Sequence, residues 1–395
     1  MNLNREQSVP EMICKNGFSV YLHGYGAIDR WLESRPAEGT RKAENNRFIL
    51  TNASTTELAK LFEKLRYPGV SLADAALNNG NQTWYLRCAD SFNENHPSFP
   101  ILEFYRDCFS GTYYDPRGVY PVLKEIRQDK KTGKENKNIF DVIKESIKYN
   151  ADRISALKDA TLILSKYLII TNIKEYKQEL NKTAEIFNNL QECSLPCQEE
   201  LRVFLCELIT APNPGIGFEL LKNCGFLKKY WPELAALEEA DHSKEFHPEG
   251  NAWEHTMETL RHRKSGSYDL SLSLGLLLHD LGKTISSSAG NHRYEGHAEL
   301  GEIQARRFLE RLGFNSPLIT DICFLVRNHM LPAALPRLPR YRTSEIMSSP
   351  LFPRLMELYR CDESSSYKGL HGYYESSAVY QQFLRNQRNP YRQRK

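Results

Sequence analysis

The sequence predicts an α+β protein: a small mixed α/β head followed by an all-α neck and an all-α C-terminal domain. Three observations lead to this prediction. Short β-type runs alternate with helical patterns up to about residue 123, whereas apolar residues recur at helical intervals from residue 139 onward. The length, 395 residues, exceeds that of one small domain and suits two or three.

The head begins with two predicted strands. The first, Phe18 to Leu22, leads into Gly24 and Gly26, and the second covers residues 47–50. Residues 54–57 (STTE) then form a capping-box pattern, which predicts the start of a helix whose apolar residues lie on one face. Strand and helix therefore alternate here, as in a mixed α/β domain.

A polar tract separates the head from the helical region. Residues 127–138 (RQDKKTGKENKN) show no hydrophobic periodicity, and we interpret 126–138 as a loop or linker that is more plausibly solvated than bound to nucleic acid. The helical remainder is divided at prolines and composition shifts. The predicted domains are a head (1–125), a helical neck of RNA-binding type (139–240), a helical domain (241–370) and a basic tail (371–395).

Composition and charge exclude several classes of protein. The 52 basic and 49 acidic side chains leave a net charge of +3, so any nucleic-acid surface must be local. The N-terminus lacks a signal-peptide pattern, and the longest apolar stretch, 272–278, is too short to span a bilayer. Nine cysteines without CxxC spacing are typical of a reducing compartment. We therefore expect a cytoplasmic protein with no membrane partner.

The residues with the clearest chemical meaning are His279 and Asp280, which follow the apolar stretch directly. An imidazole and a carboxylate at the end of a buried helix are costly unless a partner compensates both, and a metal ion would do so. Four further ligand-type residues lie at or near the ends of predicted helices: His255, His297, His329 and Asp362. The remaining histidines have no place in this order.

The order His, His-Asp, His, His, Asp resembles that of the HD-domain metal phosphohydrolases, and so do the pieces WEHT, LLLHDLGK, GHAELG, LVRNH and LYRCDE. The resemblance implies that His255, His279, Asp280 and Asp362 bind a first divalent ion. Asp280 would bridge to a second ion completed by His297 and His329. Nitrogen and oxygen ligands discriminate poorly among Mn, Fe, Ni, Co, Mg and Zn, so the metal's identity stays open.

The same resemblance implies a catalytic role for two residues. Ions sharing Asp280 would activate water for in-line attack on phosphorus, and Lys283 would neutralise charge on the phosphoryl oxygens. Arg293 and Arg327 neighbour the expected ligands, and each is as well explained by a phosphate contact as by a structural ion pair.

A wider resemblance covers residues 196–365 clearly and residues 17–125 more weakly. The segments NPGIGFELL, CGFL, WPEL and HPEG resemble the neck and HD junction of bacterial tRNA nucleotidyltransferases and poly(A) polymerases of class II. That family's head holds two metal ions on three carboxylates. Here the Arg-Asp pair after the glycines is inverted as Asp29-Arg30, and Asn46-Arg47-Phe48 stands where a D-x-D pattern is expected. No carboxylate lies in residues 83–87, whereas Arg106-Asp107 is retained.

These observations lead to one principal expectation and two alternatives. We expect a metal-dependent phosphohydrolase of the HD superfamily, acting on nucleotides, cyclic phosphates or RNA ends, with a nucleotidyltransferase-like head that has lost its activity. The first alternative is an active tRNA CCA-adding or poly(A)-type nucleotidyltransferase. The second is a non-catalytic protein that binds RNA or nucleotide, with tRNA the favoured RNA. The number of metal ions (two are expected) and the oligomeric state are not fixed by the sequence.

Overall fold

The computed structural model describes residues 8–32, 46–68, 72–79, 82–89, 100–132, 138–147, 152–170, 173–187, 196–240, 250–264, 269–286, 294–366 and 369–387. These residues form two compact units, Met1–Phe204 and Leu205–Lys395, and the boundary falls inside helix α8, Gln198–Thr210. The predicted α+β class is confirmed, since a six-stranded sheet occupies the first unit and the second is helical. The predicted domain boundaries stay a prediction.

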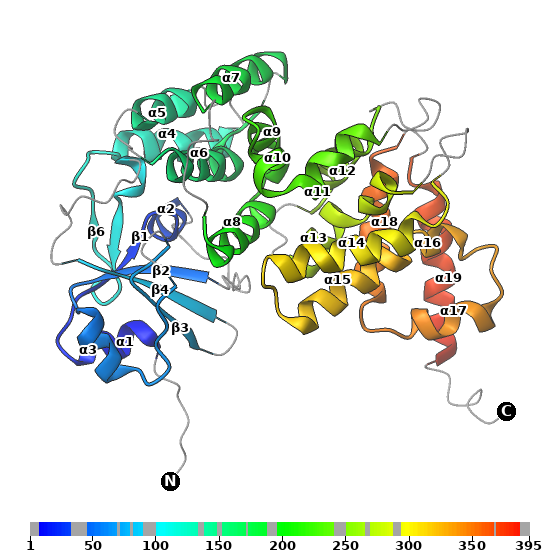
Figure 1. Ribbon diagram of the computed structural model, residues 1–395, viewed down its shortest axis with the longest axis horizontal. Helices are drawn as coiled ribbons and strands as arrows, with labels where there is room; N and C mark the ends of the chain where they lie inside the picture. The colour runs from blue at the N-terminus through cyan, green and yellow to red at the C-terminus, as the bar shows by residue number, and fades with distance from the viewer. Residues whose placement is uncertain are drawn as a thin grey trace, which may run out of the picture. The chain divides into compact units, whose positions relative to one another are not determined.

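The head is built on a mixed sheet with the order β3-β4-β2-β1-β5-β6 (Figure 1). Strand β2 lies at its centre, antiparallel to β1 and parallel to β4, with Phe48 opposite Tyr85. Both predicted strands and the predicted capping box are present, because Ser54 and Glu57 bond reciprocally at the start of α3. The elements are α1 (Val9–Lys15), β1 (Val20–His23), α2 (Tyr25–Leu32), β2 (Asn46–Thr51), α3 (Thr55–Leu61), β3 (Ala75–Asn79), β4 (Gln82–Cys88), η1 (Pro100–Leu102), β5 (Tyr105–Asp107) and β6 (Tyr113–Tyr114).

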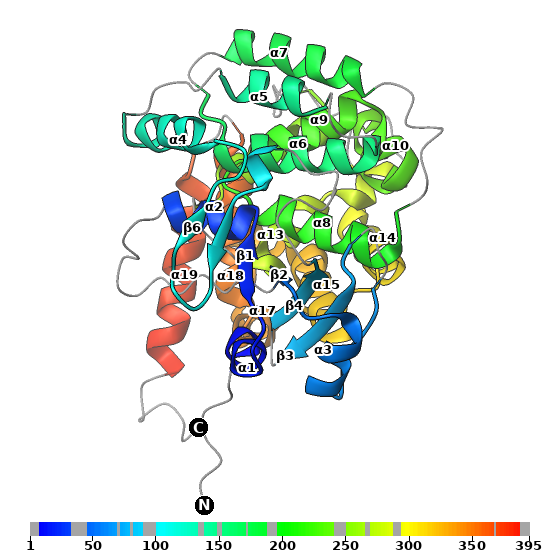
Figure 2. The same cartoon turned by 90° about the vertical axis from the view of Figure 1, so that its left-hand side faces the viewer.

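The predicted loop at 126–138 is wrong over its first part. Helix α4 continues to Thr132, because Leu123 and Ile126 are buried at helical spacing and Arg127 lies over the ring of Trp31, 5.2 Å from its centroid. Charged residues beyond this anchor extend the helix without needing to be buried. Helices α4 to α7 follow the sheet in the chain, and α6 packs beside α5 (Figure 2). They are α4 (Tyr120–Thr132), α5 (Asn138–Ile147), α6 (Arg153–Tyr167) and α7 (Ile173–Ile186).

The second unit is helical throughout its described residues. Its core helix α13 (LSLSLGLLL) is apolar on all sides and packs on α12, α15 and α18. Gly275 permits this packing, since a Cβ there would lie 2.9 Å from Leu325 Cδ1. No helix among the described residues is long and apolar enough to cross a bilayer. The elements are α9 (Pro214–Asn223), α10 (Phe226–Tyr230), α11 (Pro232–Ala235), η3 (Ala236–Glu239), α12 (Ala252–Arg261), α13 (Leu270–Leu278), η4 (Leu281–Thr284), α14 (His297–Arg311), α15 (Ser316–Asn328), α16 (Leu331–Ala334), α17 (Arg340–Met347), α18 (Phe352–Ser364) and α19 (His371–Gln387).

Candidate metal centre

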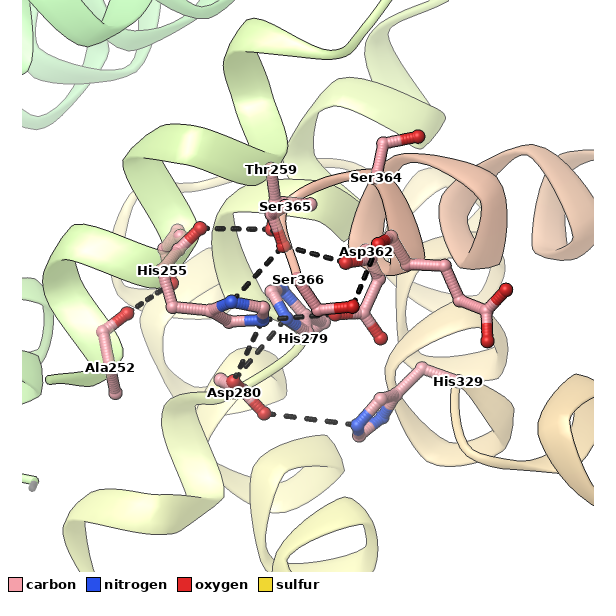
Figure 3. A network of polar contacts seen from close by, with 12 residues as sticks. Ala252, His255, Thr259, His279, Asp280, His329, Asp362, Ser364, Ser365 and Ser366 are labelled. Carbon is pink, nitrogen blue, oxygen red and sulfur yellow. Dashed lines mark hydrogen bonds and ion pairs between the residues drawn. The ribbon is translucent and has the colours of Figure 1, made fainter. Parts of the chain in front are cut away.

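Five helices and their ends bring the six expected ligands together in the second unit. Figure 3 labels all of these ligands except His297. His279 and His329 are the residues at which α13 and α15 end, and His297 is the first residue of α14. His255 lies in the first turns of α12, and Asp362 lies in the last turn of α18. The placement at helix ends that the sequence predicts is therefore observed for most of the set.

The two oxygens of the Asp280 carboxylate face two different groups of histidines. Oδ2 lies 3.8 Å from His255 Nε2 and 3.4 Å from His279 Nε2. Oδ1 lies 3.8 Å from both His297 Nε2 and His329 Nε2. Each group of three residues has its nearest ligand atoms within 4.8 Å of one another. One carboxylate thus lies between two clusters, as a bridging ligand would.

Asp362 belongs to the first cluster. Its Oδ1 lies 2.9 Å from His255 Nε2. Ligand atoms around one ion are about 3.0–3.5 Å apart when each bond is about 2.1 Å long. The spacing of His255, His279, Asp280 and Asp362 therefore suits one divalent ion held by nitrogen and oxygen ligands.

The outward-facing ring nitrogens of the histidines are occupied by protein groups. Three Nδ1–H groups donate to the carbonyl three residues earlier: His279 to Leu276 at 2.8 Å, His297 to Tyr294 at 2.7 Å and His329 to Val326 at 2.7 Å. This bonding fixes the neutral tautomer with the lone pair on Nε2, the atom that faces the cluster.

The same residues fit a metal by a second criterion, an uncompensated arrangement of buried lone pairs. His279 Nε2 is buried and has no hydrogen-bond partner within the described part of the chain. The Nε2 atoms of His297 and His329 lie only 3.1 Å apart, although both Nδ1 atoms carry the proton in the neutral rings. Buried lone pairs that face each other are costly, and a cation between them removes this cost.

Burial and charge shift the pKa values of the cluster in directions that favour metal binding. Burial opposes ionisation of Asp280, but the charge of Lys283 and the neighbouring His279 outweigh it and lower the pKa of the carboxyl well below its usual value. Burial lowers the pKa of His329 to about 4 and also lowers that of His297. Near neutral pH the carboxylate is thus charged and these two imidazoles are neutral, the states that bind metals.

The other predicted residues are placed differently. Lys283 Nζ donates to Asp280 Oδ2 at 2.7 Å, so it contacts the bridging carboxylate directly. Arg327 is half-exposed and forms an ion pair with Glu302 at 3.1 Å, which supports the structural interpretation of that residue over a phosphate contact. Arg293 lies outside the described residues.

Two features of the site were missed by sequence reasoning. Ser365 Oγ lies 3.1 Å from His255 Nδ1 and donates to the Asp362 carbonyl at 2.6 Å, so it links two expected ligands. Gly282 allows η4 to touch α14, since a Cβ there would lie 1.8 Å from the His297 carbonyl oxygen and 2.5 Å from Gly301 N. The glycine two residues after Asp280 was a usable signal, whereas nothing in the sequence distinguished Ser365.

The head differs at the strand where a nucleotidyltransferase would carry its carboxylates. Phe48 of β2 stacks on Tyr85 of β4 with ring centroids 5.0 Å apart. Both rings join an apolar cluster with Ala73, Ala76 and Val203, the last from α8. This face of the sheet is therefore packed against side chains of its own unit at Phe48.

Nearby carboxylates of the head bond to protein groups. Asp29 accepts from the Tyr167 hydroxyl at 3.0 Å, and Lys166 Nζ lies 3.4 Å from its other oxygen. Asp107 Oδ1 accepts from the backbone N–H of Phe109 at 2.7 Å and turns the chain after β5. Between β1 and α2, Gly24 adopts a φ of +57°, which permits the sharp turn that begins α2.

Comparison with known proteins identifies the second unit's domain. The HD domain family matches residues 252–359, a range that contains His255, His279, Asp280, His297 and His329 and ends three residues before Asp362. This match and the two ligand clusters together indicate the use of a divalent metal.

Curated relatives are tRNA-processing proteins. A CC-adding tRNA nucleotidyltransferase of Thermus thermophilus is 32% identical over 177 residues, which is 43% of this chain and 40% of the relative. A multifunctional CCA protein of Shewanella denitrificans is 32% identical over 108 residues, 27% of this chain and 26% of the relative. The aligned segments thus span less than half the length of these relatives.

Solved structures show a more distant likeness. The CCA-adding enzyme of Bacillus stearothermophilus in complex with CTP aligns at 14% identity and a TM-score of 0.48, covering 95% of this chain and 80% of that chain.

The comparisons correct the functional expectation drawn from the sequence. A phosphohydrolase with an inactive head was expected, but the relatives are named as a CC-adding tRNA nucleotidyltransferase and a multifunctional CCA protein. The HD metal pattern identifies a domain, and the presence of a domain does not make hydrolysis the principal reaction of the whole chain. The predicted resemblance itself is confirmed: the chain carries an HD domain and is a relative of the bacterial CC- and CCA-adding tRNA nucleotidyltransferases.

Proposed function

We propose that this protein acts in the cytoplasm on the 3′ ends of tRNA and transfers nucleotides from CTP or ATP to them. The observation that carries this proposal is the 32% identity over 177 residues to a CC-adding tRNA nucleotidyltransferase. The sharp β1–α2 turn at Gly24 supports it, because a helix N-terminus that follows a tight turn offers unpaired backbone N–H groups to a phosphate.

Nucleotide incorporation tests the proposal directly. Purified protein is incubated with tRNA transcripts that end before CCA, after one C or after CC, together with labelled CTP or ATP and Mg²⁺ or Mn²⁺. Template-independent extension of the truncated transcripts, with none on a complete CCA end, is the expected result. Absence of incorporation with every transcript and both metals contradicts the proposal.

A second candidate function is binding of tRNA or nucleotide without transfer. The packing of Phe48 against Tyr85 and Val203 favours it, because an apolar ring occupies a position where two-metal transfer needs a carboxylate. The incorporation assay separates the two candidates when it is paired with a gel-shift measurement. Binding of truncated tRNA without extension supports the second candidate, and extension excludes it.

We further propose that the HD domain holds two divalent ions. His255, His279, Asp280 and Asp362 would hold the first, and Asp280, His297 and His329 the second. When bound, such ions polarise water and phosphoryl oxygens. Asp280 would keep both ions in place, and Lys283, 2.7 Å from its Oδ2, would balance the excess negative charge. Metal analysis of the purified protein tests this proposal. About two equivalents of Mn, Fe, Ni, Co, Mg or Zn per chain are expected, and a protein without bound metal would contradict it.

Hydrolysis of phosphate esters at this centre is proposed only as an additional activity beside nucleotide transfer. A screen with 2′,3′-cyclic and linear nucleotides tests it. Release of product by the wild type, lost in Asp280→Ala, is the expected result. Equal product from both proteins contradicts it.

A further inference from the structure

The segment that follows His329 presents a positively charged surface, in which the exposed Glu345 of α17 is the neighbouring acid, three residues after Arg342. Arg337, Arg340 and Arg342 are exposed and lie within six residues of one another, at the start of α17 and just before it. Among the described residues, none of the three has a carboxylate at ion-pair distance. We define these three arginines together with Tyr341 as the α17 surface.

Other arginines of the same unit lie beside acids. Arg306 and Arg327 pair with Glu302, Arg311 with Glu233, and Arg360 with Glu357, at distances of 2.6 to 3.4 Å. Half of the arginines described in this unit thus pair with a neighbouring acid. The α17 surface leaves its charge available to an external anion.

An exposed aromatic ring lies within the same surface. Tyr341 is 77% exposed, and the Arg342 guanidinium lies 5.8 Å from its ring centroid. A ring that is exposed among unpaired cations is typical of surfaces that stack a nucleobase while the cations contact the phosphates. A purely solvated charged face needs no such ring.

The backbone of this surface is held in place. Leu335, Thr343 and Met347 are buried, and Arg340 donates to Gln382 Oε1 of α19 at 2.6 Å. In the sequence, the α17 surface begins eight residues after His329 of the candidate metal centre. Met330, which follows His329, is also exposed. The arginines are therefore presented on a fixed support, which lowers the entropic cost of binding.

From these observations we infer that the α17 surface binds the single-stranded phosphate backbone of RNA and stacks one base on Tyr341. The inference rests on the proposed function, which supplies tRNA as the RNA. It adds a binding site in the HD-containing unit, apart from the metal ligands.

Fluorescence anisotropy with a labelled tRNA transcript that lacks its CCA end tests the inference. The triple variant Arg337→Ala/Arg340→Ala/Arg342→Ala is expected to raise the Kd at least about tenfold near 0.1 M salt. It should also reduce the slope of log Kd against log salt by about 2, since each single-strand phosphate contact contributes about 0.7. Tyr341→Ala is expected to weaken binding about fivefold without changing this slope.

Two controls keep the result specific. Arg307→Ala removes another exposed arginine, on α14, that has no acid at ion-pair distance among the described residues, and it should leave the Kd within about twofold. The triple Arg→Lys variant keeps the charge and should retain the salt slope. Wild-type binding with an unchanged Kd in the triple alanine variant overturns the α17 surface alone and leaves the proposed function intact. Failure of the wild type both to bind and to extend tRNA overturns the proposed function as well.

Discussion

The HD centre and the head differ in how their carboxylates are held. In the HD centre, buried imidazole nitrogens and a carboxylate converge on points where no protein donor satisfies them all, as the orphaned His279 Nε2 shows. In the head, Asp29 and Asp107 bond to protein groups, and Phe48 is packed among apolar side chains. An added cation would satisfy the lone pairs of the first region, whereas the carboxylates of Asp29 and Asp107 in the second already bond to protein groups. Among the described residues, the buried groups without a hydrogen-bond partner on the central strands of the head are donors instead, Arg47 Nε on β2 and Trp84 Nε1 on β4. Whether a group of polar side chains can bind an added ion therefore depends on how those side chains are packed locally. The order of domains along the chain does not determine it.

The largest effect is expected from removing the shared carboxylate. Asp280→Asn should reduce the metal content from about two ions to less than about 0.2 per chain, because both clusters lose a ligand. Elemental analysis after gel filtration measures it. Asp321→Asn, an acid on α15 outside the clusters, is the matched control and should keep its metal. Full metal content in Asp280→Asn would show that the convergence of imidazoles has another cause.

The contact between η4 and α14 offers a second way to break the HD centre. Gly282→Ala should destabilise the protein by at least about 3 kcal/mol, because its Cβ would overlap the His297 carbonyl and Gly301 N. Urea unfolding measures this change. Gly215→Ala is the control, since a Cβ there meets its nearest atom, Met257 O, at 3.8 Å. Equal stability of the two variants would contradict the proposed close approach.

The head is tested by truncating the ring on β2. Phe48→Ala should lower the free energy of unfolding by about 2 kcal/mol, because it removes the stack on Tyr85 and part of the apolar cluster. It should leave the metal content unchanged, since Phe48 lies in the other unit. Tyr67→Ala, which truncates an exposed ring of the head, is the control and should cost less than about 0.5 kcal/mol. Loss of metal from the Phe48→Ala variant would contradict the expectation that the HD centre binds metal independently of the packing in the head.

The smallest effect concerns Asp159, a carboxyl on α6 of the first unit that bonds to Tyr25 of α2. Burial raises the pKa of Asp159 to about 7, and the Tyr25 hydroxyl donates to its Oδ1 at 3.3 Å. The folded state therefore binds a proton that the unfolded state has released, so stability should fall as pH rises from about 4 to about 7. Asp159→Asn should flatten this dependence and raise stability at pH 8 by about 1–2 kcal/mol. Urea unfolding at pH 5 and pH 8 measures it, and an unchanged slope would contradict the protonated state.

The two regions also differ in how far the sequence determined them. The order of ligand-type residues predicted the HD centre through its resemblance to the HD family, and most of these residues lie at or near helix ends, which places their side chains together where the helices meet. The helix α4 was missed because charged residues carry no hydrophobic period, although Arg127 extends the helix by stacking on Trp31. The pairing of Lys283 with Asp280 and the role of Ser365 depend on distances that residue order does not contain. The principal function was wrong for a related reason: an HD pattern reports a domain's ligands and not the reaction of the whole chain.

The bonding of the histidines through Nδ1 has a consequence for how this centre tolerates change. His279, His297 and His329 are oriented by main-chain carbonyls three residues earlier, and a carbonyl is present whatever side chain that position carries. Substitutions at Leu276, Tyr294 or Val326 that preserve the backbone should therefore leave the imidazoles aimed at the same points. The side chains at these three positions can therefore change during evolution while the coordinating nitrogen atoms keep their geometry.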